Sequence, residues 1–305
     1  MNSIEITPEY SLGAGAPCFV LAEVGINHNG DRKLGEELIA AAAEAGAHGV
    51  KFQNYQTEEF ISDRSQTYTY TSQGQEITEP IFGMFKRYEI DFDFISHMKD
   101  VCDDHNLLFT STPTGQKGID DLMRVGAPVL KNGSDYLTNL DFIRRLGETG
   151  LPVILSCGMS TLGDIDEAVR AFQETGNDRL ILLHCTSSYP TPSSDVHLRK
   201  IESLQQIFDM QVGFSDHTEG PVAGLLAASM GACMIEKHFT LDRNLSGPDH
   251  RFSCDPSELA ALVKGVVAAR EMMGDPKLGP TEREGASRND FRMSCIAAKS
   301  LPAGH

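Results

Sequence analysis

The sequence has few positive charges. Lysine and arginine together number 26 against 43 aspartates and glutamates, which gives a formal net charge of −17. A surface this acidic repels the phosphate backbone of nucleic acids, so we expect no nucleic-acid partner. A small anionic ligand would need lysines gathered at its own site to reverse the local sign of the field.

The sequence also lacks paired cysteines and long apolar runs. Its seven cysteines are scattered, their number is odd, and no C-x-x-C pair occurs. This pattern predicts reduced, mostly buried thiols rather than a disulfide framework or a zinc site. The opening residues "MNSIEITPEY" have no basic segment followed by an apolar one, and no apolar run reaches membrane-spanning length. We therefore expect a cytoplasmic protein without a membrane partner.

Short apolar runs rich in Val, Ile and Leu recur along the chain, and segments with helical periodicity separate them. Alternating strands and helices predict right-handed crossovers and a parallel sheet, and eight such units predict an α/β fold, the (β/α)8 TIM barrel. A doubly wound sheet is the alternative, but "VGINHNG" after the first run lacks the glycine spacing of a dinucleotide-binding loop. The predicted strands span 18–25, 49–55, 107–113, 129–134, 152–158, 180–186, 212–217 and 234–240, and helical segments include 32–46, 166–176 and 222–231.

Two segments depart from this rhythm. Residues 56–90, rich in Thr, Ser, Gln and Tyr, would form a long loop on the catalytic face, either a lid or a surface insertion without a role. Residues 275–290 are polar with Pro and Gly, which is typical of a linker, and 291–305 have the pattern of the first strand and turn of another domain. The barrel domain would then span 1–274.

Polar residues lie at the C-terminal ends of several predicted strands. Side chains alternate between the two faces of a strand, so Glu236 shares a face with His238 at the end of "MIEKHFT". In a barrel these strand ends converge on one mouth, where active sites are built. The pattern therefore predicts a functional site that contains Glu23, Lys51, Gln53, Ser215, His217, Glu236 and His238.

These residue types suit a metal-assisted reaction on a small phosphorylated or carboxylated substrate. His217 and His238 lie on neighbouring strands, about 4.8 Å apart, and two imidazoles there can bind one divalent metal and leave positions for water and substrate. Lys51 and Lys131 suit a compact anion, and Glu23 is a candidate proton carrier. Hydroxyl donors would be Thr112, Ser134 and Ser215.

A set of motifs occurs in a fixed order over nearly the whole chain. They are "AEVGINHNG" (22–30), "VKFQ" (50–53), "STP" (111–113), "LKNGS" (130–134), "LSCGMS" (155–160), "HCTSSYPTP" (184–192), "GFSDHT" (213–218), "EKHFT" (236–240) and "GPDH" (247–250). With these motifs the chain resembles the sialic acid synthases, the NeuB family of N-acetylneuraminate synthases. The resemblance implies that phosphoenolpyruvate condenses with an N-acetylated hexosamine, typically N-acetylmannosamine, to a sialic acid and phosphate, with cleavage of a C–O bond.

The resemblance also implies a partner and roles for individual residues. The family forms homodimers and carries a small C-terminal antifreeze-like (SAF) domain, of which residues 291–305 would be the truncated beginning. His217 and His238 would bind Mn2+, Mg2+ or Co2+ to polarise the sugar aldehyde, and the catalytic carboxylates would be Glu23 and Glu236. Phosphoenolpyruvate would be held by Lys51, Thr112, Lys131, Ser134, Ser187 and Ser215, and the sugar by Gln53, Tyr189 and Asp249.

The sequence departs from the family pattern beside this site. Asp135 and Tyr136 stand where Gly-Glu is usual, which leaves N-acetylmannosamine and a 2,4-diacetamido sugar both open as the acceptor, and Ser187 stands where Asn is usual. Two other functions stay open from the residues. One is a metal-free Schiff-base aldolase with Lys51 or Lys131 as the nucleophilic amine. The other is a non-catalytic sugar-phosphate-binding barrel.

Overall fold

The computed structural model describes residues 3–13 and 15–304 of the chain. The chain divides into two units, Met1–Met272 and Met273–His305. Within the described ranges, no helix is long and apolar enough to cross a membrane.

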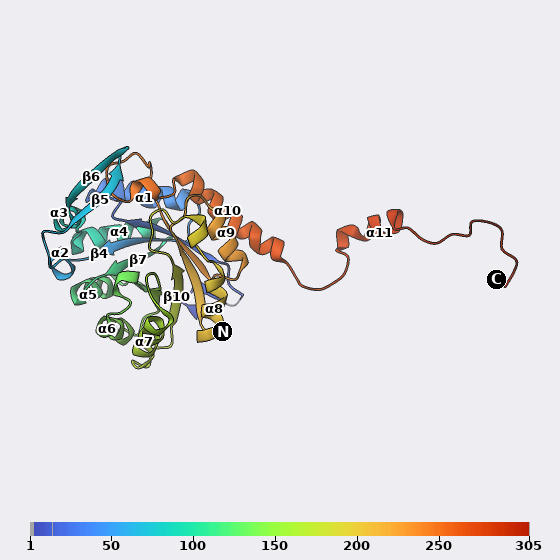
Figure 1. Ribbon diagram of the computed structural model, residues 1–305, viewed down its shortest axis with the longest axis horizontal. Helices are drawn as coiled ribbons and strands as arrows, with labels where there is room; N and C mark the ends of the chain where they lie inside the picture. The colour runs from blue at the N-terminus through green and yellow to red at the C-terminus, as the bar shows by residue number, and fades with distance from the viewer. Residues whose placement is uncertain (1–2, 14, 305) are drawn as a thin grey trace. The chain divides into compact units, whose positions relative to one another are not determined.

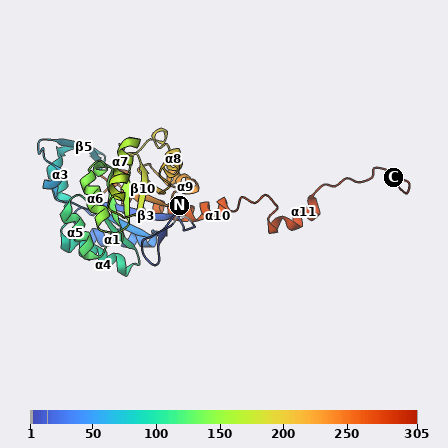
Figure 2. The same ribbon diagram turned by 90° about the horizontal axis from the view of Figure 1, so that it is seen from below.

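Eight parallel strands form a barrel in the first unit (Figure 1 and Figure 2). Each hydrogen-bonded pair of neighbours in this sheet is parallel, and β7 and β8 lie side by side to close the ring. The closing seam includes a hydrogen bond from Thr110 Oγ1 to Val129 O, 2.7 Å long. The predicted TIM barrel is confirmed, and the doubly wound alternative is wrong. The strands are β3 (Phe19–Gly25), β4 (Gly49–Asn54), β7 (Leu108–Pro113), β8 (Leu130–Asn132), β9 (Val153–Ser156), β10 (Leu180–Cys185), β11 (Gln211–Asp216) and β12 (Met234–His238).

Helices surround the barrel and pack their apolar sides on it. Helix α7 shows how local chemistry sets a boundary: it begins at Leu162, earlier than the periodicity predicts, because Thr161 and Asp164 form a capping box at its start. Helix α5 ends where Gly126 takes a left-handed conformation. The helices are α1 (Arg32–Glu44), α4 (Phe92–Asp104), α5 (Gln116–Val125), α6 (Leu140–Glu148), α7 (Leu162–Gln173), α8 (Arg199–Phe208), α9 (Val222–Ser229) and α10 (Pro256–Met273).

The core has two layers that leave one end of the barrel for polar chemistry. The larger layer lies between the strands and the helices. The smaller fills the barrel interior near the N-terminal ends of the strands, with Phe19, Leu108, Ile181 and Met234 among its buried members. A short hairpin of β1 (Ile4–Glu5) and β2 (Ser11–Leu12) packs against this layer. The opposite end, where the strands finish, is therefore the place for a site.

The insertion predicted as a long loop has secondary structure of its own. It contains α2 (Thr57–Phe60), a hairpin of β5 (Thr67–Ser72) and β6 (Gln75–Pro80), and α3 (Ile81–Tyr88). The Glu89 carboxylate accepts hydrogen bonds from both N–H and Oγ1 of Thr57, each 2.9 Å long, which ties the two ends of the segment together. Its function as a lid stays a prediction.

The second unit contains only short helical pieces in its described part. They are η4 (Glu282–Glu284), which Thr281 caps, and α11 (Gly285–Phe291), inside the predicted linker. Phe291 and Ile296 are exposed, and no strand occurs among the described residues of this unit. The antifreeze-like assignment of residues 291–305 stays a prediction, and His305 lies outside the described residues.

A buried histidine just after β3 makes the barrel sensitive to acid. His28 has no exposed surface, packs against Phe52 and Phe94, and accepts a hydrogen bond from the Gly30 N–H. Burial, with a smaller contribution from the charge of His250, lowers the pKa of His28 to about 3. The unfolded chain takes up this proton near pH 6.5, whereas the folded chain does not, so stability is lost as the pH falls through that range.

We expect the free energy of unfolding to fall by about 2 kcal/mol between pH 7 and pH 5 because of His28 alone. Urea unfolding of the wild type and of His28→Asn at both pH values would measure it, because asparagine retains an acceptor for the Gly30 N–H without titrating. The wild type should lose about 2 kcal/mol more than the variant over this interval. Equal losses would contradict the assignment.

Candidate active site

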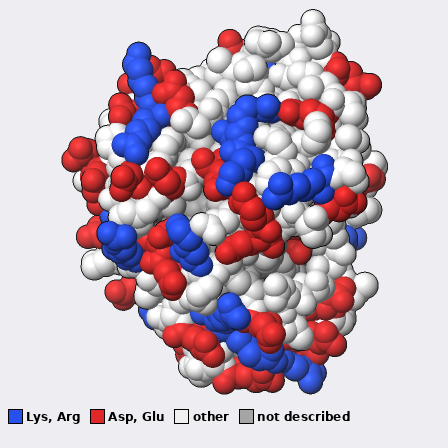
Figure 3. Space-filling view, turned by 90° about the vertical axis from the view of Figure 1, so that its left-hand side faces the viewer, with Lys and Arg blue, Asp and Glu red and all other residues white. Residues whose placement is uncertain are grey.

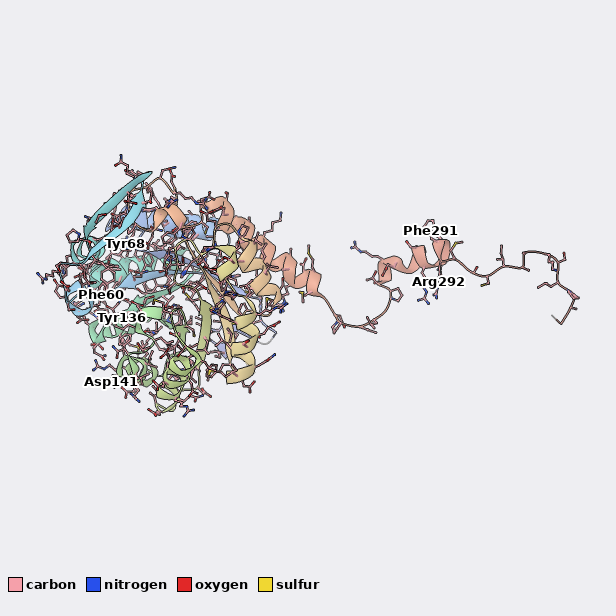
Figure 4. All side chains as sticks on the ribbon, viewed as in Figure 1. Phe60, Tyr68, Tyr136, Asp141, Phe291 and Arg292 are labelled. Carbon is pink, nitrogen blue, oxygen red and sulfur yellow. The ribbon has the colours of Figure 1, made fainter. Side chains whose placement is uncertain are left out.

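The predicted site residues come together in a cavity at the C-terminal mouth of the barrel. The cavity has a volume of about 560 Å³. All but one of the predicted residues line it, and the exception, Asp249, lines an adjoining cavity of about 270 Å³ that shares Gln53, Tyr189 and His238 with the first. Phe60 and Tyr68 of the insertion also line the larger cavity, and Figure 4 labels both.

A chain of alternating charges lies on the cavity floor. Lys51 Nζ is 2.8 Å from Glu23 Oε2 and 3.7 Å from Glu236 Oε2. Lys131 Nζ is 3.6 Å from Glu236 Oε1. These four side chains are nearly fully buried, so each depends on its neighbours to offset the cost of desolvating a charge.

The pKa values of this network follow from burial and neighbouring charge. Burial raises the pKa of Glu23, and Lys51 opposes the rise. For Glu236, burial is outweighed by Lys131 and Lys51, and the pKa falls. Burial and the Lys51 charge lower the pKa of Lys131, although Glu236 opposes this. The Lys51 pKa rises because Glu23 and Glu236 outweigh its burial. The two lysines available to an anionic ligand therefore differ in pKa, which is raised for Lys51 and lowered for Lys131.

His217 and His238 lie side by side above these charges. Their ring centroids are 5.5 Å apart. His217 Nδ1 is 2.8 Å from Thr186 O, so this nitrogen donates, and Nε2 is an acceptor when the imidazole is neutral. Burial lowers the pKa of His217, but Cys185 and Thr186 O outweigh it and raise the pKa, so metal binding at Nε2 would compete with a proton. Burial and the charge of His217 lower the pKa of His238 well below its usual value, which makes His238 a neutral imidazole.

The two histidines fit a divalent ion, although they do not form a complete set of protein ligands. Among the described residues, no group of three or more His, Cys, Asp or Glu side chains is placed to hold a metal. However, His238 Nδ1 is buried without a hydrogen-bond partner in the described part of the chain, and it lies 4.0 Å from Asp249 Oδ2. A neutral nitrogen without a partner beside a second acceptor nitrogen suits an ion that also takes water or substrate oxygen.

Hydroxyl groups also line the cavity, next to the lysines and carboxylates of its floor. Ser134, in η1 (Ser134–Tyr136), accepts a 3.0 Å hydrogen bond from the Gly158 N–H. Thr112 Oγ1 accepts from Lys51 Nζ at 2.9 Å, and Ser215 Oγ donates to Glu236 Oε1 at 3.0 Å. Together with the lysines, they offer a donor-rich surface for carboxylate or phosphate oxygens.

The predicted sugar residues form the outer part of the site. Gln53 Nε2 donates to Glu23 Oε1 at 3.0 Å. The Tyr189 ring lies 4.2 Å from the His217 ring. Burial and the Glu23 charge raise the pKa of Asp249 to about 7.

Sequence reasoning missed several residues that the structure places in the cavity. Ser156 accepts a 2.6 Å hydrogen bond from Lys131, and Cys185 Sγ is 3.9 Å from His217 Nδ1. Ser156 is the last residue of β9 and Cys185 is the last residue of β10, and both side chains face the inside of the barrel. The two-residue alternation that identified Glu236 could therefore also have found them. Tyr55, just after β4, and Phe60 and Phe85 of the insertion also line the cavity, and their rings meet edge to face.

At positions 135 and 136 the sequence departs from the family pattern, and the structure shows which of the two side chains faces the cavity. Asp135 lines the cavity and is one of the charges that raise the pKa of Lys51. Tyr136, labelled in Figure 4, packs its ring edge-on against Phe142 and is not among the lining residues. Asp135 therefore supplies the acidic group at this rim.

The surface shown in Figure 3 carries Lys and Arg interspersed with Asp and Glu, without a broad field of one sign. The lysines that bear on an anionic ligand are instead buried in the cavity, where Lys51 and Lys131 are 3% and 2% exposed. Recognition of an anion would therefore depend on the cavity and not on the outer surface.

Comparisons with known proteins agree with this geometry. A model described as the NeuB family matches residues 38–277. The chain is 37% identical to the N,N'-diacetyllegionaminic acid synthase of Campylobacter jejuni over 93% of this chain and 86% of the relative. It is 34% identical to the Legionella pneumophila protein of the same name, over 96% of this chain and 83% of that one. The crystal structure of an N-acetylneuraminic acid (sialic acid) synthetase from Leptospira borgpetersenii is 33% identical, with a TM-score of 0.84, and covers 96% of this chain and 98% of that one.

Proposed function

This chain belongs to the NeuB family, and from that premise we propose that it joins phosphoenolpyruvate to an N-acetylated hexosamine and releases a nonulosonic acid and phosphate. The observation that carries the proposal is the meeting of Lys51, Lys131, Glu23 and two histidines in one cavity. Two buried lysines suit the carboxylate and phosphate of phosphoenolpyruvate. The carboxylates and histidines provide the groups that proton transfer and aldehyde activation require.

The chemical steps follow from these positions. A C–C bond forms between C3 of phosphoenolpyruvate and the aldehyde carbon of the open-chain sugar, and positive charge develops at C2. The former aldehyde oxygen takes up a proton and becomes a hydroxyl, and the proton that the attacking water later releases balances this one. The Glu23 carboxylate stabilises this charge and accepts a proton from the water that adds to C2. The C–O bond to phosphate then breaks, with its electron pair leaving on phosphate, and the C2 hydroxyl loses its proton to give the ketone. Lys51 and Lys131 neutralise the departing phosphate.

A divalent ion fits this scheme at His217 and His238. When bound, it would supply Lewis-acid polarisation of the aldehyde oxygen. His217 presents Nε2 because its Nδ1–H donates to Thr186 O, and His238 is held neutral by its surroundings. The two side chains that face these rings, Tyr189 and Phe252, cover them with aromatic surface.

We infer that the acceptor is a 2,4-diacetamido hexose. The relatives at 37% and 34% identity are named N,N'-diacetyllegionaminic acid synthases. In the cavity, the Tyr55, Phe60 and Phe85 rings, 5.0 to 5.5 Å apart, present an apolar surface that suits the methyl of a second acetamido group. Asp135 can accept a hydrogen bond from a hydroxyl or amide N–H of the sugar.

Phosphate release from phosphoenolpyruvate tests the function directly. With Mn2+ present, we expect release with a 2,4-diacetamido hexose, slower release with N-acetylmannosamine, and none after EDTA. A faster rate with N-acetylmannosamine would overturn the acceptor assignment alone.

Two outcomes would replace the synthase by another function. Metal-independent turnover, with pyruvate trapped on Lys131 by borohydride, would favour a Schiff-base aldolase, for which the lowered pKa of Lys131 is the supporting observation. Phosphoenolpyruvate binding without phosphate release from any sugar would favour a non-catalytic barrel. The homodimer stays a prediction that light scattering can check.

A further inference from the structure

The outer side of β11 and β12 carries a buried ion pair that does not touch the cavity. Asp216 and Lys237 are 1% and 3% exposed, and Lys237 Nζ is 2.8 Å from Asp216 Oδ2. They are register partners on neighbouring strands, and neither lines the cavity. Each directly neighbours one of the two histidines in the sequence: Asp216 precedes His217, and Lys237 precedes His238.

Thr218 joins this pair on the other side of His217. Asp216 Oδ1 accepts hydrogen bonds from the Thr218 N–H at 2.9 Å and from Thr218 Oγ1 at 2.8 Å. Lys237 Nζ donates to Thr218 O at 2.7 Å. Asp216, Thr218 and Lys237 therefore hold the backbone on both sides of His217 and fix it to the residue before His238. We call these three residues the clamp.

Burying an ion pair is costly, and apolar side chains of similar volume often stabilise a fold as well or better. Sheet pairing already joins β11 to β12, so the fold itself does not require charges here. Directional hydrogen bonds offer what apolar packing does not, which is a fixed distance and orientation between two strand ends.

We propose that the clamp is a positioning device, which sets the separation and ring orientation of His217 and His238 so that both reach one divalent ion. The proposal rests on the proposed function, because it presupposes a metal at these histidines. The residues of the clamp do not line the cavity, so they would act through the two imidazoles. Groups that orient ligating histidines typically change metal affinity by about 10- to 100-fold when they are replaced.

The test is calorimetric titration of Mn2+ into the protein without substrate. The variant Asp216→Leu/Lys237→Met replaces the ion pair by apolar groups of similar size. We expect its Mn2+ dissociation constant to rise about 10- to 100-fold, with the dissociation constant for phosphoenolpyruvate without metal unchanged. The matched control is Thr110→Val, which removes the buried hydrogen bond to Val129 O at the β7–β8 seam, away from the histidines. It should leave Mn2+ affinity at the wild-type value.

The outcomes separate this proposal from the proposed function. If the wild type does not bind Mn2+, or His217→Ala/His238→Ala binds it equally well, the metal assignment fails and the clamp fails with it. If the wild type binds Mn2+ through these histidines and the double clamp variant binds it equally well, only the clamp is overturned. Should the double variant not fold, Thr218→Val removes one hydrogen bond without removing a charge. The Mn2+ dissociation constant of Thr218→Val should also rise above the wild-type value. Wild-type Mn2+ affinity in a folded Thr218→Val would contradict the proposal.

Discussion

Replacing Lys51 by methionine is expected to lower kcat/KM for phosphoenolpyruvate by about 10²- to 10³-fold, the range for losing one electrostatic group at a reacting centre. The same change should lower the free energy of unfolding by about 3–5 kcal/mol at pH 7, because it leaves buried carboxylates without their counter-charge. Lys51 Nζ lies 2.8 Å from Glu23 Oε2 and 3.7 Å from Glu236 Oε2, so it pairs with both carboxylates, whereas Lys131 Nζ pairs with Glu236, at 3.6 Å. Steady-state phosphate release and urea unfolding would measure the two effects.

A surface lysine provides the control. Lys33, 3.5 Å from Glu37 on α1, is exposed, and Lys33→Met should change unfolding free energy by less than about 1 kcal/mol and leave kcat/KM unchanged. The variant Lys51→Met/Glu23→Gln separates the effect of losing Lys51 on stability from its effect on activity. Removing the Glu23 charge should restore part of the lost stability but none of the activity. If Lys51→Met retained wild-type kcat/KM, Lys51 would have no function in binding the anion.

Replacing Gly158 by alanine is expected to lower kcat/KM for phosphoenolpyruvate by about 100-fold, because a displacement near 1 Å at a reacting site has effects of this size on the rate. A Cβ on Gly158 would lie 2.4 Å from Ser187 Oγ and 2.7 Å from Ser134 Oγ. Both distances are far too short, so the serines must move apart. These two serines come from the loops after β10 and β8 and are proposed to hold the same anion.

Gly163 offers a matched glycine in the same connection. It lies in the first turn of α7, and a Cβ there would meet only Thr161 Oγ1, at an ordinary 3.7 Å. Gly163→Ala should therefore raise the free energy of unfolding by about 0.4–1 kcal/mol without affecting kcat/KM. Titration of phosphoenolpyruvate into Gly158→Ala would show whether binding is the step affected. Unchanged affinity would mean that the serines do not contact the ligand.

Sequence reasoning found the barrel because its signals are local. Strands such as 180–186 and 234–240 were recognisable from short apolar runs, and the inward phase of Glu236 and His238 from the two-residue alternation of a strand. Helix ends were less well predicted. The capping box of Thr161 and Asp164 adds a turn to α7 that apolar periodicity does not show.

The sequence by itself determined the fold class and the charged residues and histidines at the mouth of the barrel, since period and order along the chain are enough to place strand ends together. The resemblance to a family added Ser187, Tyr189 and Asp249, and Ser156 and Cys185 were recognised only in the structure. Only the tertiary structure decided how those residues interact. That Asp135 and not Tyr136 faces the cavity, and that Lys51 and Lys131 have pKa shifts of opposite direction, depends on contacts between different βα units. Distances of a few ångströms between side chains far apart in sequence set these energies, and no local pattern encodes such distances.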